Sequence, residues 1–178
     1  MTTPVVGIAG WKNSGKTTLA VKLIAELTRR GLRVASVKHA HHDANVDHEG
    51  TDSFRHRAAG AVEVALVTSR RWAVMHVLRD ESEPSLADML ARLSTTDIVI
   101  VEGYKREPIP KIEVRRSAAA ATEALAASDP NIIALAADYT ADGSGRPTFD
   151  LNDVAGIADF VVAHFRLRPA PPTGRDRL

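Results

Sequence analysis

Gly10-Trp11-Lys12-Asn13-Ser14-Gly15-Lys16-Thr17 matches the pattern G-x-x-x-x-G-K-[ST], and the segments on either side give this motif a structural context. Before it, residues 5–9 form a short apolar run rich in β-branched side chains, which is typical of a buried strand. After it, apolar residues recur at three- and four-residue spacing and so share one helix face: Leu19, Leu23, Ile24 and Leu27. A strand, a glycine-containing loop and a helix in this order predict a phosphate-binding loop.

The residue types in this loop suit phosphate chemistry. Gly10 and Gly15 allow backbone conformations that bring main-chain N–H groups close to phosphate oxygens, at the positive end of the helix dipole. We expect Lys16 to reach the β- and γ-phosphates and the hydroxyl of Thr17 to ligate Mg²⁺. The remaining loop residues are expected to contact the nucleotide as well: Lys12, Asn13, Ser14 and Thr18.

Further apolar runs, several of them alternating with helical patterns, predict an α/β fold with a doubly wound and mainly parallel sheet. They cover residues 34–37, 98–101, 111–114 and 132–135. Ligands of such sheets gather at the carboxyl ends of the strands, where Lys16, Lys38 and Glu102 all fall. The sequence thus predicts a P-loop nucleotide-binding domain over residues 1–165.

The runs 62–67 and 73–78 are separated by too few residues for a crossover helix, so they predict an added antiparallel β-hairpin that interrupts the alternation of strands and helices. Its edge, which bears Trp72 and Met75, is a candidate surface for a second subunit; the alternative is an ordinary hairpin packed on its own sheet. Helices are expected over 52–60, with Asp52 or Ser53 as its N-cap, and over 84–93 and 152–165. The alanine-rich residues 118–127 indicate either a short surface helix or a mobile insertion, and the Pro- and Arg-rich residues 166–178 a disordered tail.

Composition limits the classes of function. The chain has 178 residues, is 44% hydrophobic and carries a formal net charge of +1. Because no overall positive field exists, neither nucleic acid nor a membrane is expected as a partner. The absence of cysteine excludes disulfides and thiolate metal sites. With no signal-like segment and no long apolar run, a soluble cytoplasmic protein is expected.

Two further segments are expected to complete the phosphate site. Residues 97–101 form an apolar strand that ends at Glu102, and an acid at this point of a phosphate-loop protein holds Mg²⁺ directly or through water. Lys38 and Lys105 would add positive charge where phosphoryl transfer develops negative charge. Lys16 and Glu102 are therefore candidate catalytic residues, together with Asp43 of the polar segment 38–50.

The polar segment 38–50 allows two interpretations. It is either a loop that approaches the γ-phosphate, with Asp43 or a histidine touching Mg²⁺ through water or orienting the attacking water, or a transition-metal site. The candidate metal ligands are His39, His41, His42, Asp43, Asp47 and His48. Consecutive residues cannot all face one ion, so at most a subset of them could ligate a metal. We favour the first interpretation.

Base recognition is the least defined part of the predicted site. The Asn-Lys-x-Asp pattern by which many GTPases read guanine does not occur in the sequence. Asp138 follows the apolar run 132–135 and could accept two N–H bonds from a guanine edge. A loop acid without such a role is at least as compatible with the residues.

The order of these elements resembles the molybdopterin-guanine dinucleotide biosynthesis protein B family. The resemblance spans residues 5–165 and rests on segments 10–17, 38–43, 50–53, 101–105, 150–154 and 158–161. Tyr104 stands where the family pattern has Phe. The Lys-His-x-His-His-Asp and Val-Glu-Gly-x-Lys elements carry its specificity, because the phosphate loop alone is generic.

This resemblance implies a GTP-binding protein with Mg²⁺ and slow GTPase activity. It further implies an accessory role to the molybdenum cofactor guanylyltransferase that attaches GMP to molybdopterin, alongside other molybdopterin-handling proteins, and a homodimer formed through strands of the 62–78 hairpin. Two rivals remain: a GTP-dependent metal-delivery protein that uses the histidine loop, and a small-molecule kinase. The kinase would need an arginine-bearing lid, for which Arg70, Arg71 and Arg79 are the clustered candidates.

Overall fold

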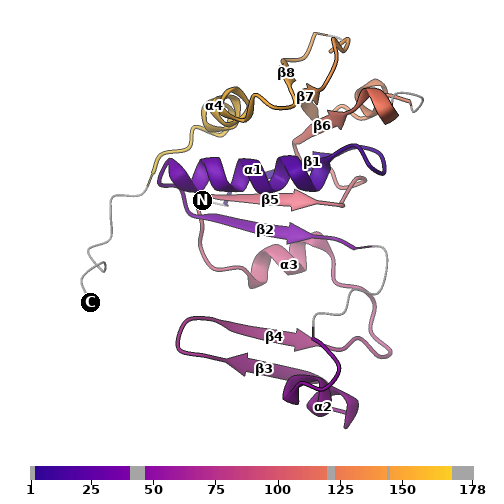
Figure 1. Cartoon of the computed structure of the whole chain (residues 1–178), viewed down its shortest axis with the longest axis vertical. Coiled ribbons are helices and arrows are strands. Elements are labelled where there is room, and N and C mark those ends of the chain that lie inside the picture. Colours follow the sequence, from indigo (N-terminus) through magenta and orange to yellow (C-terminus); the bar gives the residue numbers. More distant parts are fainter. Residues whose placement is uncertain (1–2, 41–46, 120–122, 144, 170–178) are drawn as a thin grey trace. The chain divides into compact units, whose positions relative to one another are not determined.

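The computed structural model describes residues 3–40, 47–119, 123–143 and 145–169. The chain comprises two compact units, one formed by residues 1–39 and 89–178 and the other by residues 40–88 (Figure 1). That residues 1–165 act as one nucleotide-binding domain stays a prediction.

The first unit is built on a six-stranded sheet with the strand order β2-β5-β1-β6-β7-β8, in which all neighbours are parallel. The strands are β1 (Val5–Ala9), β2 (Val34–Lys38), β5 (Ile98–Glu102), β6 (Lys111–Arg115), β7 (Ile132–Ala137) and β8 (Thr148–Asp150). Their carboxyl ends meet at one edge, and β1, which leads into the phosphate loop, lies between β5 and β6. This order places Glu102 on one side of the loop and the end of β6 on the other.

Helices α1 (Lys16–Arg29) and α4 (Val154–Phe165) pack together over the sheet, as Figure 1 shows. The predicted apolar face of α1 is confirmed, because Leu19, Leu23 and Leu27 are buried. They join alternate side chains of the central strands in the main core, such as Val6 and Ile8 of β1. Removing these side chains from water is the principal stabilising contribution to this unit.

On the face of β6 opposite the main core, polar side chains are buried together with part of the alanine-rich segment. Lys111 and Glu113 are each 1% exposed. The described part of residues 118–127 contains no α-helix, only the 3₁₀ turns η1 (Ser117–Ala119) and η2 (Leu125–Ala127). Leu125 and Ala126 are buried in a second, smaller core, so η2 packs against the sheet.

The second unit contains α2 (Asp52–Ala58) and the antiparallel hairpin of β3 (Glu63–Val67) and β4 (Trp72–His76). The N-cap of α2 is Thr51, whose hydroxyl accepts from the N–H of Phe54, so the expected caps Asp52 and Ser53 were one and two residues too late. Helix α3 (Leu86–Arg92) begins in this unit.

The predicted α/β fold, with a mainly parallel sheet and an added antiparallel hairpin, is confirmed. Strand β8 was not predicted from the sequence. Within the predicted tail, Leu167 packs against the main core, and residues 170–178 lie outside the described residues.

Candidate functional site

The phosphate loop adopts the geometry that its glycines predict. Gly10 and Gly15 have φ angles of +151° and +92°, and Gly15 is the N-cap of α1. A Cβ on Gly10 would lie 2.6 Å from both the Ser14 hydroxyl and the carbonyl oxygen of Val114, so no other residue fits there. The loop therefore directs the N-terminus of α1 at the carboxyl edge of the sheet, where main-chain N–H groups and the helix dipole favour an anion.

Lys16 folds back over this loop, and its ammonium donates to the carbonyl oxygen of Trp11 at 2.6 Å. Burial lowers the pKa of Lys16 below its usual value; Glu102 acts in the opposite direction, and the charges of Lys105 and Lys38 lower it further. The three ammonium groups thus disfavour one another in the absence of an anion. A bound polyphosphate would relieve this repulsion.

Thr17, Lys38 and Glu102 converge beside Lys16. The Thr17 hydroxyl donates to Oε1 of Glu102 at 2.6 Å, and Nζ of Lys38 lies 3.6 Å from the same oxygen and 3.4 Å from the Thr17 hydroxyl. Lys38 and Glu102 are direct neighbours in the register of β2 and β5. A hydroxyl and a carboxylate are oxygen donors of the kind that Mg²⁺ prefers. The Lys38 ammonium lies beside the same two oxygens, so a positive charge is favourable at this position.

The segment after Glu102 folds against the end of β2. Gly103 has a φ of +103°, and a Cβ there would lie 2.5 Å from the carbonyl oxygen of His39. The ring of Tyr104 lies 4.9 Å from that of His39. Lys105 returns toward the phosphate loop, where its Nζ lies 3.3 Å above the centre of the Trp11 indole. The predicted residues Lys16, Thr17, Lys38, Glu102 and Lys105 are therefore gathered at one place.

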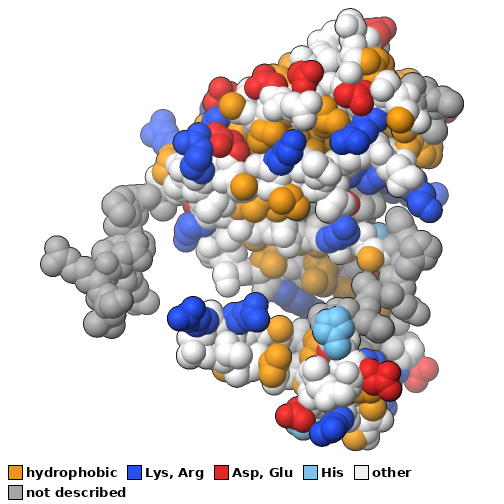
Figure 2. All heavy atoms as spheres, in the orientation of Figure 1, with side chains coloured by type: hydrophobic (Ala, Val, Ile, Leu, Met, Phe, Trp, Pro, Cys, Tyr) orange, Lys and Arg blue, Asp and Glu red, His pale blue; other side chains and the backbone are white. Residues whose placement is uncertain are grey.

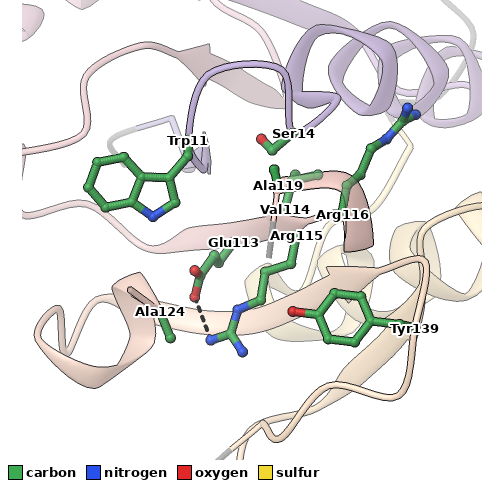
Figure 3. Close-up of a pocket in the computed structure, with 9 residues that line it drawn as sticks. All are labelled: Trp11, Ser14, Glu113, Val114, Arg115, Arg116, Ala119, Ala124 and Tyr139. Atoms are coloured by element: carbon green, nitrogen blue, oxygen red, sulfur yellow. Dashed lines mark hydrogen bonds and ion pairs between the residues drawn. The ribbon is translucent and has the colours of Figure 1, made fainter. Parts of the chain in front are cut away.

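A small pocket of about 50 Å³ lies on the other side of the loop, at the ends of β6 and β7. Trp11, Glu113, Arg115 and Tyr139 surround it (Figure 3), and the loop contributes Ser14. Oγ of Ser14 and Nε of Arg116 are buried without a hydrogen-bond partner among the described residues. Nε and Nη2 of Arg116 lie 3.0 and 3.2 Å from where a Cβ of Gly15 would be, so this guanidinium covers the glycine.

Asp138 lies just beyond β7, at the same edge of the sheet. Its Oδ1 accepts the backbone N–H of Ser117 at 2.7 Å, so one carboxylate oxygen already holds the start of η1. A contact with a guanine edge would rely on Oδ2 or on the second lone pair of Oδ1. The role of Asp138 in base recognition stays a prediction.

Several sequence predictions fall outside the described residues. Asp43, His41 and His42 belong to the segment 41–46. Across the ranges that the structure describes, no group of three or more His, Asp and Glu side chains could hold a metal ion. Asp47 is buried and forms a two-point ion pair with Arg57, which gives this acid a structural role. Lys12, Asn13 and Thr18 are exposed on the loop and the first turn of α1.

Four residues on the β6 side of the loop were not predicted from the sequence: Trp11, Arg115, Arg116 and Tyr139. For Arg115 and Arg116 a signal existed, because they come directly after the predicted strand 111–114, just as Lys38 comes after 34–37. For Trp11 and Tyr139 none existed, since their contacts depend on how distant segments close around the loop.

None of the helices among the described residues is long and apolar enough to cross a membrane. Residues 5–138 match the family described as molybdopterin guanine dinucleotide synthesis protein B. Molybdopterin-guanine dinucleotide biosynthesis adapter proteins of Haemophilus influenzae and Escherichia coli are 42% and 40% identical to this chain over 161 residues, covering 89% of it and 87% and 91% of their own lengths.

Two solved structures are similar to this chain in fold over most of its length. The crystal structure of a MobB protein homolog from Bacillus stearothermophilus has a TM-score of 0.66 and 32% identity, and the match covers 92% of this chain and 99% of the other. A structure of molybdopterin-guanine biosynthesis protein B has a TM-score of 0.70 and 28% identity, with 91% and 99% covered. With the family match over most of its length and these relatives at 40% identity or more, the chain belongs to the MobB family, molybdopterin guanine dinucleotide synthesis protein B.

Proposed function

We propose that the protein binds GTP with Mg²⁺, hydrolyses it slowly, and assists the guanylyltransferase that converts the molybdopterin cofactor into molybdopterin guanine dinucleotide. The relatives from Haemophilus influenzae and Escherichia coli are named adapter proteins of this biosynthesis, which supports the accessory role. The observation that carries the nucleotide part is the convergence of Thr17, Lys38 and Glu102 at the N-terminus of α1.

The strand order supports one orientation of the proposed nucleotide along the carboxyl edge of the sheet. Glu102 and Lys38 lie on the β5 side of the loop, so the β- and γ-phosphates belong there. The nucleoside end then extends to the β6 and β7 side, where Asp138 and the pocket of Figure 3 lie. This direction agrees with a role of Asp138 in reading guanine.

Each predicted residue has a role in this proposal. Thr17 and Glu102 would hold Mg²⁺, which neutralises charge on the terminal phosphates when bound. Lys16, Lys38 and Lys105 would stabilise the negative charge that develops during hydrolysis. Asp43 would orient the attacking water. The weak hydrolysis expected from the family resemblance suits an adapter whose nucleotide state is read by a partner.

The β3–β4 hairpin supports the proposed homodimer. In its register Val67 lies opposite Trp72 and Ala65 opposite Val74, so these side chains share one face of the hairpin. Val67, Trp72 and Val74 are 73%, 70% and 50% exposed. Figure 2 shows hydrophobic side chains at the surface of this hairpin, near basic side chains. Because an isolated two-stranded sheet is only marginally stable, a second hairpin is a suitable cover for this face.

Isothermal titration calorimetry tests nucleotide binding. With Mg²⁺ present, the protein is expected to bind GTP more tightly than ATP, and Lys16→Ala to weaken binding severely because a charge-assisted phosphate contact is lost. Lys22→Ala removes an exposed lysine of α1 and serves as the matched control. Unchanged GTP affinity in Lys16→Ala would refute the proposed site, and equal affinities for GTP and ATP would refute the specificity.

The accessory role needs a separate test. Immobilised protein is expected to retain purified guanylyltransferase, and addition of the protein with GTP and Mg²⁺ is expected to increase the yield of molybdopterin guanine dinucleotide. If neither retention nor a higher yield is seen with protein that binds GTP, the nucleotide site stands and the adapter role does not.

A further inference from the structure

The side chain of Trp11 joins two parts of the structure that are far apart in sequence. Its indole N–H donates to the carbonyl oxygen of Glu123 at 2.7 Å, and its ring carries the ammonium of Lys105 at 3.3 Å. Its own carbonyl oxygen accepts from Lys16. One residue of the phosphate loop therefore contacts both Lys16 and Lys105.

A buried carboxylate holds the segment that carries the acceptor of the indole N–H. Glu113 of β6 accepts the backbone N–H of Leu125 through Oε1 and that of Ala126 through Oε2, at 2.8 and 2.9 Å. These bonds fix η2 and hence the neighbouring residue Glu123, whose carbonyl fixes the indole. These hydrogen bonds connect the ring to the sheet through η2.

The Trp11 ring stabilises the ammonium of Lys105 electrostatically. The ammonium of Lys105 and that of Lys16 both contact Trp11, so two like charges lie near each other. Before an anion binds, this mutual repulsion drives a flexible lysine side chain away from the site. The negative face of an aromatic ring offsets that repulsion, and Trp has the strongest such face.

We infer that Trp11 is a positioning residue that holds the Lys105 ammonium beside the phosphate loop, ready for the terminal phosphate of the nucleotide. This inference rests on the proposed nucleotide function. Holding the cation in advance reduces the entropy that Lys105 loses on binding, so the contribution appears as affinity. The ring needs no contact with the nucleotide for this effect.

A double-mutant cycle tests the inference. Trp11→Leu is expected to weaken GTP binding about two- to five-fold, the range that corresponds to an exposed cation–π contact, and Lys105→Met by more. In the Lys105→Met background, Trp11→Leu is expected to have no further effect. Trp11→Phe, which keeps an aromatic face, should recover part of the loss. Lys22→Met is the matched control for removing a lysine.

A fluorescence measurement separates this inference from the proposed function. Trp11 and Trp72 are the two tryptophans, so Trp72→Phe leaves Trp11 as the single reporter. In nucleotide-free protein, Lys105→Met is expected to shift or change the intensity of Trp11 emission, whereas Lys22→Met is not. Equal losses from Trp11→Leu with and without Lys105, or emission unchanged by Lys105→Met, would overturn the inference. A different outcome is that unaltered protein does not bind GTP although Trp11 emission responds to Lys105→Met. That result would overturn the nucleotide function and the predicted effect on affinity, but not the contact between Trp11 and Lys105.

Discussion

The hydroxyl of Thr17 donates to Oε1 of Glu102 at 2.6 Å, although 85 positions separate the two residues in the chain. The contact follows from the parallel pairing of β1 and β5, which places the end of the phosphate loop beside the end of the neighbouring strand. In the proposed function these two oxygens would supply two of the six ligands that Mg²⁺ takes.

Glu102→Gln is expected to remove most of the Mg²⁺ dependence of GTP binding, because a neutral amide replaces the anionic ligand. The loss of a contact to a charged group corresponds to about ten- to a hundred-fold in affinity. Calorimetric titrations with and without Mg²⁺ measure it. Glu102→Asp keeps the carboxylate and should retain part of the dependence; an unaltered Mg²⁺ effect in Glu102→Gln would assign the metal to other residues.

Gly103→Ala is expected to destabilise the protein and displace Glu102. The positive φ alone costs about 1–2 kcal/mol for a residue with a Cβ, and here the added atom also meets the His39 backbone. Gly31→Ala is the matched control, because Gly31 has a φ of +84° but its nearest contact would be 3.7 Å away. Urea unfolding should show a larger loss for Gly103→Ala, and equal losses would mean that the backbone of His39 moves aside at little cost.

The main features of the fold and of the phosphate site could be predicted because they depend on local patterns. The α1 face has helical periodicity, and Lys38 and Glu102 end apolar strands that a parallel sheet brings together. Strand β8 could not be predicted, since its three residues Thr148–Asp150 form no apolar run. Nor could the partner of Trp11, because the carbonyl of Glu123 approaches only when the segment after β6 closes over the sheet.

Strand β6 shows a different limit of sequence reasoning. Its alternation of polar and apolar residues is typical of a half-exposed strand, yet Lys111 and Glu113 are both buried. Each has a specific partner, since Lys111 pairs with Asp129 and Glu113 with Arg115 and two backbone N–H groups. Burial of charge depends on partners that are distant in sequence, which a periodicity does not contain.

The pair of Lys111 and Asp129 leads to an asymmetric prediction. The ammonium and carboxylate are 2.8 Å apart, and the side chain of Lys111 is 2% exposed against 23% for Asp129. Asp129→Ala should cost about 3–5 kcal/mol, because it leaves a buried charge unpaired. Lys111→Met should cost less, since Asp129 keeps its bonds from Asn131. Urea denaturation of both variants measures this difference, and equal costs would show that Lys111 finds another partner.

The same pair predicts a response to acid. Burial raises the pKa of Asp129, but hydrogen bonds from Lys111 and Asn131 outweigh it and hold the pKa below its usual value. A carboxyl group whose pKa is lower in the folded than in the unfolded protein stabilises the fold. This stability is present above the pKa of the unfolded state, about 3.9, and is lost as the pH falls through the pKa of the folded state. The free energy of unfolding should therefore decline below about pH 4, and less steeply in Asp129→Asn.

In the second unit, His76 is expected to titrate above its ordinary pKa of 6.5, because it shares hydrogen bonds with Glu63 and Glu81. A histidine whose pKa is higher in the folded than in the unfolded protein stabilises the fold. This stability is fully present below the pKa of the unfolded state and disappears as the pH rises through the pKa of the folded state. NMR titration of the imidazole C–H resonances measures this pKa. Glu63→Gln should lower it, and a pKa indifferent to that change would show that the cross-strand contact is absent in solution.

The exposed face of the hairpin predicts the oligomeric state. Val67 and Trp72 form a cross-strand pair and are the most exposed large apolar side chains of the described residues, so a partner that covers them gains burial of both. Sedimentation velocity is expected to show a dimer that Val67→Lys dissociates, because a charge replaces an apolar contact at the centre of the proposed interface. Val21→Lys alters a comparably exposed valine of α1, which is 61% exposed, and should leave the dimer intact. Dissociation by Val21→Lys but not by Val67→Lys would place the interface on α1 and leave the hairpin face open to a different partner.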